Sequence, residues 1–223
     1  MFVKLKDISY FKICFIIIKY IIVLKSYWIL LRGVDIVKKI IPFAHDLLKE
    51  TVQAGDIVVD ATLGNGNDSL FLSELVGDEG KVYSFDIQKE AIENSMMLFK
   101  DNHVHNVHCI LSGHEHAKNE LLNRGIKEID GVIFNLGYLP GSNQEVTTHG
   151  ETTLKAINDL FEILKKDKYI VLVVYPGHKE GELEKQYLLQ ELNKFPAKQA
   201  DIFIYQMINR SEKAPFVIGI YKK

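Results

Sequence analysis

The chain has 223 residues, of which 47% are apolar and 25% are charged, and its formal net charge is −2. This length and composition fit one medium-sized globular domain and exclude a collagen-like, disulfide-stapled or low-complexity chain. The two cysteines, Cys14 and Cys109, lack metal-binding spacing, so we expect no metal site, and we expect a reducing, cytoplasmic location.

The charge is unevenly distributed along the chain. Residues 1–33 carry six Lys or Arg against one Asp, a net charge of +5, which leaves −7 for residues 34–223. An acidic body argues against broad, non-specific binding to a phosphate backbone. It still allows a local basic rim that recognises one feature of a nucleic acid.

Residues 1–33 form an expected N-terminal extension to a domain at 34–223. Uncharged runs such as 13–18 and 20–24 are far shorter than the roughly 20 residues of a membrane-spanning helix. No small-residue cleavage site follows, which disfavours a secretory signal. Two interpretations stay open: an amphipathic helix on a membrane surface, or upstream sequence included through a misplaced start codon. We favour the second and do not expect membrane attachment.

From residue 37 the hydrophobic pattern alternates between helical and strand periods. The expected helices are 37–52, 67–75, 89–101, 116–124, 151–166 and 180–195. The expected strands are 56–61, 81–87, 107–112, 129–141 (running into a loop), 169–178, 200–209 and 215–223. Strands separated by helices predict right-handed crossovers, and the closing pair without a helix predicts one antiparallel strand. The expected fold class is therefore α/β: a Rossmann-like, doubly wound, seven-stranded, mostly parallel sheet that resembles class I methyltransferases.

The first loop of interest lies in "VVDATLGNGNDSLFL", residues 58–72. In open α/β sheets ligands bind beyond the carboxyl ends of the strands. Gly64 and Gly66 allow a tight turn and a close approach of the backbone to a ligand. No Gly-Lys-Ser/Thr follows, which excludes a P-loop. A dinucleotide fingerprint would need a third small residue; Ser69 stands at that position and is tolerable in size, but it is not the residue expected there.

Three carboxylates at this edge decide between the possible ligands. Asp60 ends the first strand, Asp68 opens the next helix and Asp86 ends the second strand. Asp60 and Asp68 would repel a pyrophosphate, whereas S-adenosylmethionine carries an ammonium and a sulfonium and no phosphate. Asp86 is placed to accept hydrogen bonds from ribose hydroxyls. Although Asp68 alone could be a helix cap, the set favours S-adenosylmethionine as the cofactor.

The loop after the third strand contains His114, Glu115 and His116. These three lie too close together in the chain to form a metal site by themselves, and a solvated helix start is the alternative. We expect the turn at 112–114 to contact the adenine side of the cofactor.

The loop after the fourth strand, "FNLGYLPGSN" (134–143), is where a methyl acceptor would lie. It resembles the Asn-Pro-Pro-Tyr loop of amino-group methyltransferases, in which the Asn side chain binds the target nitrogen. Asn135 is the expected polar anchor, next to the cofactor, and Tyr138 is expected to stack on or hydrogen-bond the acceptor. An ordinary turn capped by Asn135 is the alternative.

The nucleophile is expected to be nitrogen or oxygen rather than a ring carbon. Neither Cys14 nor Cys109 lies on the reacting loop, which disfavours carbon methylation through a cysteine adduct. Transfer to nitrogen or oxygen needs positioning and a proton acceptor. His178 is our candidate; Tyr175 or water could serve instead, and His178 could equally orient the substrate.

Taken together, the motifs resemble one bacterial family of class I methyltransferases known as rRNA methylases. The family is associated with methylation of the aminomethyl group on the wobble uridine of tRNA. The resemblance runs from about residue 37 to the end. It rests on "IIPFAHDLL", "VVDATLGNGNDSLFL", "VYSFDIQKEAIENS", "FNLGYLPG", "ETT", "VVYPGH" and "YQMIN…PF". It implies that the cofactor is contacted by Asn65, Asn67, Asp68, Asp86, Gln88 and His114. His149 and Gly150 stand where the family has Lys-Pro, and Pro176 where it often has His.

The expected function is transfer of a methyl group from S-adenosylmethionine to the aminomethyl nitrogen at tRNA position 34, forming 5-methylaminomethyl-2-thiouridine. A wobble base is single-stranded and can flip out, so the expected partner is the tRNA anticodon stem-loop. Tyr138 and Tyr175 are expected to stack on the base, and Arg210 to contact loop phosphates. An rRNA or small-molecule methyltransferase, a non-catalytic binding module and a homodimer remain open.

Overall fold

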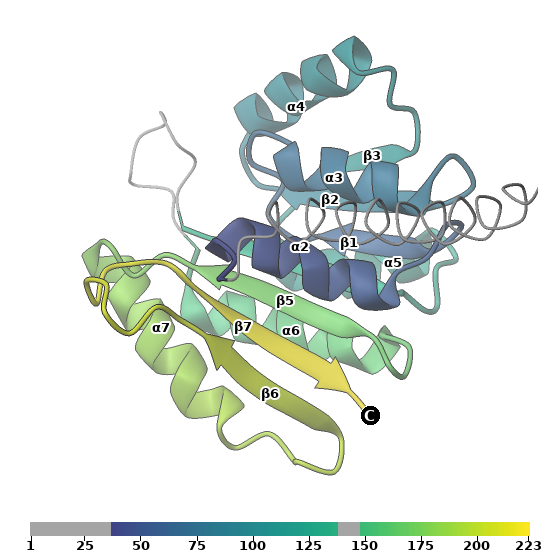
Figure 1. The fold of residues 1–223 in the computed structure, drawn as a ribbon. Helices are drawn as coiled ribbons and strands as arrows, with labels where there is room; N and C mark the ends of the chain where they lie inside the picture. Colours follow the sequence, from purple (N-terminus) through teal and green to yellow (C-terminus); the bar gives the residue numbers. More distant parts are fainter. Residues whose placement is uncertain (1–36, 138–147) are drawn as a thin grey trace, which may run out of the picture. The chain divides into compact units, whose positions relative to one another are not determined.

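The computed structural model describes residues 37–137 and 148–223, and the compact unit that they build runs from Lys39 to Lys223. A seven-stranded sheet lies between two layers of helices (Figure 1). The strands are β1 Ile57–Asp60, β2 Lys81–Asp86, β3 Val107–Leu111, β4 Gly131–Leu136, β5 Tyr169–Val174, β6 Ala200–Tyr205 and β7 Phe216–Lys222. The helices are α2 Ile40–Thr51, α3 Asn67–Val76, α4 Lys89–Asp101, α5 Ala117–Asn123, α6 Gly150–Ile163 and α7 Lys179–Leu192, with a 3₁₀ turn, η1, at His114–His116.

The strand order is β3-β2-β1-β4-β5-β7-β6. All neighbouring pairs are parallel except those of β7, which runs antiparallel to both β5 and β6. The order reverses between β1 and β4, where an open α/β sheet has its ligand crevice. The predicted doubly wound, mostly parallel sheet with one antiparallel strand is confirmed.

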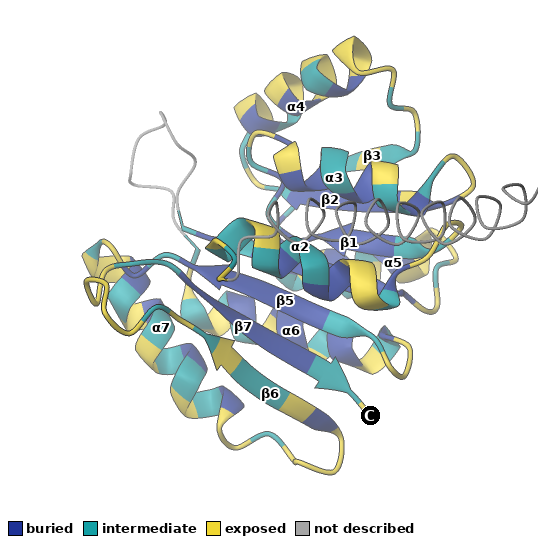
Figure 2. Ribbon diagram, in the orientation of Figure 1, coloured by how far each residue is buried: buried dark blue, intermediate teal, exposed yellow. Residues whose placement is uncertain are grey.

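Two apolar cores hold the layers together, one on each face of the sheet. One core contains buried residues of α2 and α3, and the other contains buried residues of α5, α6 and α7. In α6 the buried Thr153, Ala156, Ile157 and Leu160 recur at helical spacing, so this helix presents one face to the sheet. Strand β5 is buried almost throughout, as expected of a strand covered on both faces (Figure 2).

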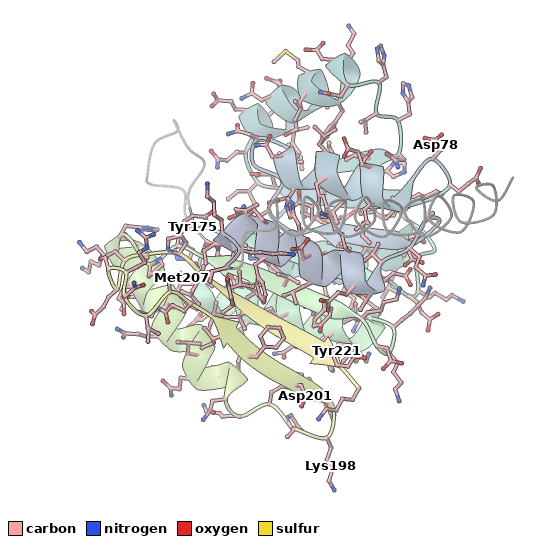
Figure 3. All side chains as sticks on the ribbon, viewed as in Figure 1. Asp78, Tyr175, Lys198, Asp201, Met207 and Tyr221 are labelled. Carbon is pink, nitrogen blue, oxygen red and sulfur yellow. The ribbon has the colours of Figure 1, made fainter. Side chains whose placement is uncertain are left out.

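The loop between β6 and β7, residues 206–215, lies at the ligand edge of the sheet. Because β7 is antiparallel to both neighbours, β6 is parallel to β5, and its carboxyl end points the same way. A Cβ built on Gly177, just after β5, would lie 3.7 Å from the carbonyl oxygen of Lys213 in this loop. Figure 3 agrees, because Tyr175 and Met207 lie near one end of these strands, and Asp201 and Tyr221 near the other.

The described elements match the predicted ones with small shifts at their ends. Strand β5 stops at Val174 rather than continuing to residue 178, and η1 precedes α5. Every helix among the described residues is too short or too polar to cross a bilayer.

Candidate active site

The glycine loop after β1 is held in a tight turn by backbone geometry that favours glycine. Gly64 has φ 51° and Gly66 has φ 80°, and the Gly66 N–H donates to the Leu63 carbonyl at 2.8 Å. A Cβ at Gly66 would lie 2.9 Å from Ser95 Oγ on α4. Ser95 Oγ also donates to the Gly64 carbonyl at 3.0 Å. Ser95 therefore fixes the loop from the neighbouring helix, a role that the sequence pattern did not indicate.

Asp60 supports the loop from inside the protein. Its side chain is fully buried and accepts hydrogen bonds from Ser69 Oγ at 2.6 Å and from the Thr62 N–H at 3.1 Å. Ser69 Oγ also lies 2.7 Å from Ser84 Oγ on β2. Burial, and then the nearby Asp68 carboxylate, raise the pKa of Asp60 to about 7. Ser69, at the third position of the glycine pattern, thus connects helix α3 to β1 and β2.

Asp86 ends β2 beside the same loop. One carboxylate oxygen accepts from the Gly64 N–H and the other from the Gln88 N–H, both at 2.9 Å. The side chain is only partly buried, and each oxygen has a further lone pair. The following residue, Ile87, is an apolar side chain with 61% of its surface exposed. An acceptor for hydroxyls therefore stands next to an exposed apolar surface.

His114 lies in η1, packed against the interior. Its ring meets Phe134 edge to face at 5.6 Å, and its Nε2 lies 3.5 Å from Thr153 Oγ1. Burial lowers the pKa of His114 below its usual value, although Glu115 acts in the opposite direction. A buried imidazole with a lowered pKa is neutral near pH 7, so His114 offers one donor and one acceptor nitrogen.

Asn135, near the end of β4, is bound at two atoms. Its backbone N–H donates to Thr62 Oγ1 at 2.6 Å, and its side-chain Nδ2 donates to Asp68 Oδ2 at 3.0 Å. The other oxygen of Asp68 lies 2.7 Å from His45 Nε2 on α2. Asp68 is nearly buried, with 7% of its surface exposed. Helices α2 and α3 and strand β4 thus meet at one carboxylate, and the sequence pattern alone indicates no role for His45.

Three further predicted residues that the structure describes, Tyr175, His178 and Arg210, follow β5 or lie on the β6–β7 loop at this edge. Tyr175 follows β5 and is partly buried, and burial, followed by the Asp68 charge, raises its pKa above the usual value. His178 precedes α7; a Cβ on the buried Gly181 would touch both the His178 ring and the Tyr175 carbonyl. Arg210 is exposed on the β6–β7 loop. Tyr138 lies outside the described residues, as does Cys14.

Residues predicted to contact the cofactor surround the turn. Asn65 and Asn67 are exposed, Gln88 is partly buried, and Asp60 has no exposed surface. Cys109 lies within β3, and burial raises the pKa of its thiol to about 11, so the thiol is protonated at neutral pH. Within the described part of the chain, no three metal-binding side chains cluster.

Another buried carboxylate, Glu184 on α7, lies next to the site. It accepts hydrogen bonds from Thr148 Oγ1 at 2.6 Å and from Thr153 Oγ1 at 2.8 Å. Burial raises its pKa, while the two threonine hydroxyls and the nearby His149 and His178 act to lower it. Since Thr153 also meets His114, Glu184 connects α7 and α6 to the loop that follows β3.

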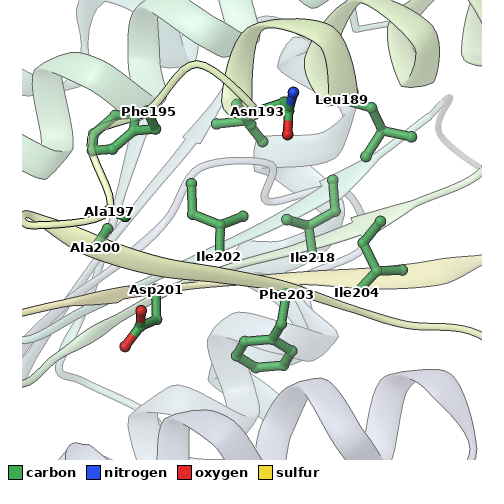
Figure 4. A pocket seen from close by; sticks show the side chains of 11 residues that line it. Leu189, Asn193, Phe195, Ala197, Ala200, Asp201, Ile202, Phe203, Ile204 and Ile218 are labelled. Carbon is green, nitrogen blue, oxygen red and sulfur yellow. The ribbon is translucent and has the colours of Figure 1, made fainter.

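A cavity of about 330 Å³, lined mostly by apolar residues together with Asn193 and Asp201, lies elsewhere in the fold, between the end of α7 and strand β6. Figure 4 shows Ile202, Ile204 and Ile218 pointing toward α7, and Phe203 pointing to the opposite face of the sheet. This cavity is lined by none of the predicted site residues.

Known proteins identify the family. A family model described as "Putative rRNA methylase" matches residues 82–221. The chloroplastic tRNA (mnm(5)s(2)U34)-methyltransferase of Arabidopsis thaliana is 37% identical over 194 residues, which cover 83% of this chain and 70% of the relative. This chain belongs to the rRNA methylase family. It is a methyltransferase that depends on S-adenosylmethionine, as predicted.

Solved structures agree with this assignment. The crystal structure of a "putative rRNA-methylase" from Clostridium thermocellum has a TM-score of 0.79 and 35% identity, covering 84% of this chain and 99% of that one. A "putative methyltransferase" from Streptococcus mutans, solved in complex with SAH, has a TM-score of 0.74 and 33% identity, covering 84% of this chain and all of the other.

Proposed function

We propose that this protein methylates the primary amine of the aminomethyl group on the wobble uridine of tRNA. The observation that carries the proposal is the side-chain amide of Asn135, held by Asp68 at the ligand edge. The name of the Arabidopsis relative supports this substrate, since it specifies mnm(5)s(2)U34 in tRNA. The acidic body is compatible with it, because recognition of one flipped base needs only local contacts.

The residues of the glycine loop fit S-adenosylmethionine. Asp86 would bind the ribose hydroxyls, and the turn from Gly64 to Gly66 would let the backbone approach the cofactor. Asn65, Asn67, Gln88 and His114 complete the proposed set of contacts. Asp68 supplies negative charge near a cationic ligand, and Asp60 acts through the loop that it supports. When bound, the cofactor supplies an electrophilic methyl group on a positively charged sulfur.

Asn135 would orient the acceptor amine. A carboxylate can only accept hydrogen bonds, so the NH₂ end of the Asn135 amide faces Asp68, and Oδ1 is turned away from it. In that orientation Oδ1 can accept a hydrogen from the amine and leave the nitrogen lone pair free to react. Holding the nucleophile in line with the methyl group is the main contribution expected of such a site.

The proton of the amine needs an acceptor. Tyr175 is a poor one, because its raised pKa keeps the phenol protonated at neutral pH. We therefore assign Tyr175 to stacking on the base or donating to it, together with Tyr138. His178 and water stay as the proposed proton acceptors. Arg210, on the exposed loop at the same edge, would contact a phosphate of the anticodon loop.

The test is methyl transfer in vitro with labelled S-adenosylmethionine and total RNA from a bacterial strain lacking this modification. We expect label in tRNA and conversion of 5-aminomethyl-2-thiouridine to its methylaminomethyl form by nucleoside mass spectrometry. Label in rRNA alone, or no label in RNA, would refute the proposal. We further expect Asn135→Ala to lower kcat/KM by about 100-fold or more while sparing cofactor affinity. An equal loss of both would refute its assigned role.

A further inference from the structure

His45 is a partly buried residue that has no role in the mechanism proposed above. It lies on α2, and its ring stacks face to face on Phe71 of α3, with centroids 3.8 Å apart and planes 1° apart. Its Nε2 is 2.7 Å from Asp68 Oδ1, and its side chain is 18% exposed. The carboxylate can only accept, so Nε2 carries the hydrogen of this bond.

The same carboxylate holds Asn135 through its other oxygen. Asp68 Oδ2 accepts from Asn135 Nδ2 at 3.0 Å, so His45, Asp68 and Asn135 form a chain of two hydrogen bonds across α2, α3 and β4. A nearly buried carboxylate is costly to leave without partners, because it has lost most of its water. Among the residues that the structure describes, His45 and Asn135 are the side-chain donors to Asp68, so His45 supplies one of the restraints on this carboxylate.

We infer that His45 is a positioning residue for methyl transfer. It acts through Asp68 to fix the orientation of the Asn135 amide. In that orientation Oδ1, and not the NH₂ group of the amide, faces the acceptor amine. The inference rests on the proposed role of Asn135 as the residue that binds the acceptor amine. Without His45, the carboxylate loses one of its restraints and can rotate, and the amide that depends on it is no longer fixed.

Two substitutions of His45 distinguish the effect of its hydrogen bond to Asp68 from the effect of its packing against Phe71. His45→Gln places an N–H donor where Nε2 stood, whereas His45→Leu keeps apolar contact with Phe71 and has no donor. We expect His45→Leu to lower kcat at least tenfold, with the Kd for S-adenosylmethionine and the KM for tRNA changed less than threefold. We expect His45→Gln to recover most of kcat. Phe71→Leu is the matched control: it removes the stacked ring but leaves the His45–Asp68 bond, and kcat should stay near that of the wild type.

A double-mutant cycle tests whether His45 acts through Asn135. The variant His45→Leu/Asn135→Ala should be no slower than Asn135→Ala alone, because the amide that His45 positions is already gone. Independent, additive losses would overturn the inference, as would wild-type kcat in His45→Leu.

A readout on the free protein keeps this inference separate from the substrate assignment. We expect the side-chain NH₂ resonances of Asn135, identified by their loss in Asn135→Ala, to shift in His45→Leu and to return toward wild-type positions in His45→Gln. Unchanged resonances in His45→Leu would overturn the inference whatever the substrate is. Failure of the wild type to methylate tRNA would instead overturn the proposed function.

Discussion

At the scale of single residues, Asp60 shows how the site makes stability depend on pH. Its pKa is raised from 3.8 to about 7, first by burial and then by Asp68. Between these two values the folded protein keeps a proton that the unfolded chain has released. The stability from this group is therefore complete below about pH 4 and is lost as the pH rises through about 7.

Asp60→Asn should remove this dependence, because the amide is neutral at every pH. Its oxygen can accept from the Thr62 N–H, and its NH₂ can donate to Ser69 Oγ, whose hydrogen can turn to Ser84. We expect the Tm of Asp60→Asn to fall less than that of the wild type between about pH 5 and pH 8. Thermal melts followed by circular dichroism would measure both slopes, with the exposed Asp78→Asn as a control. Equal slopes in wild type and Asp60→Asn would contradict the assignment.

Alanine substitutions at Gly66 and Gly125 distinguish the effect of backbone strain from that of steric contact in the site. Both have φ 80°, but a Cβ at Gly66 would lie 2.9 Å from Ser95 Oγ, and one at Gly125 has nothing within 4 Å. Alanine should cost about 1–2 kcal/mol at either position through the left-handed backbone. Gly66→Ala should lose more stability, and its Kd for S-adenosylmethionine should rise at least tenfold. Denaturant unfolding and calorimetry would show this, and similar Kd values in the two variants would argue against the turn as the cofactor site.

At the scale of elements, the directions of the strands place the β6–β7 loop at the ligand edge of the sheet. We expect this loop to contact RNA because it lies at the same edge as the proposed active site. Arg210 is exposed there, while the exposed Lys198 precedes β6 at the opposite edge (Figure 3). We expect Arg210→Glu to raise the KM for tRNA about tenfold at low salt, with a smaller effect at higher salt, because phosphate contacts are screened. Lys198→Glu is the charge-matched control and should leave KM within twofold. A similar rise in both variants would indicate a general charge effect rather than a contact.

The elements were predictable from sequence because each carries its own periodicity. The buried stripe of α6 and the continuous apolar run of β5 need no knowledge of the rest of the fold. Strand ends could also be predicted to meet, which placed Asp60, Asp86 and Asn135 at one edge.

The contacts between these elements could not be predicted in the same way. His45 bonds Asp68 across 23 residues, Ser95 bonds Gly64 across 31, and Thr148 bonds Glu184 across 36. Each pair depends on how two helices or loops pack, and a lone His, Ser or Glu in a helical pattern carries no local sign of its partner. His45 precedes the glycine loop in the sequence, but nothing in its local pattern indicates that it binds Asp68. The structure adds the partner and therefore the role.

At the scale of the whole molecule, the net charge of +5 in residues 1–33 contrasts with −7 in residues 34–223. We propose that residues 34–223 form the catalytic domain, because all described site residues and both apolar cores lie after residue 38. A basic segment could still add general attraction for RNA. Deleting residues 2–33 should therefore leave kcat within twofold and change the KM for tRNA by no more than a few-fold at about 0.15 M salt. A loss of kcat above tenfold, with the Tm unchanged, would show that the extension contributes to the active site.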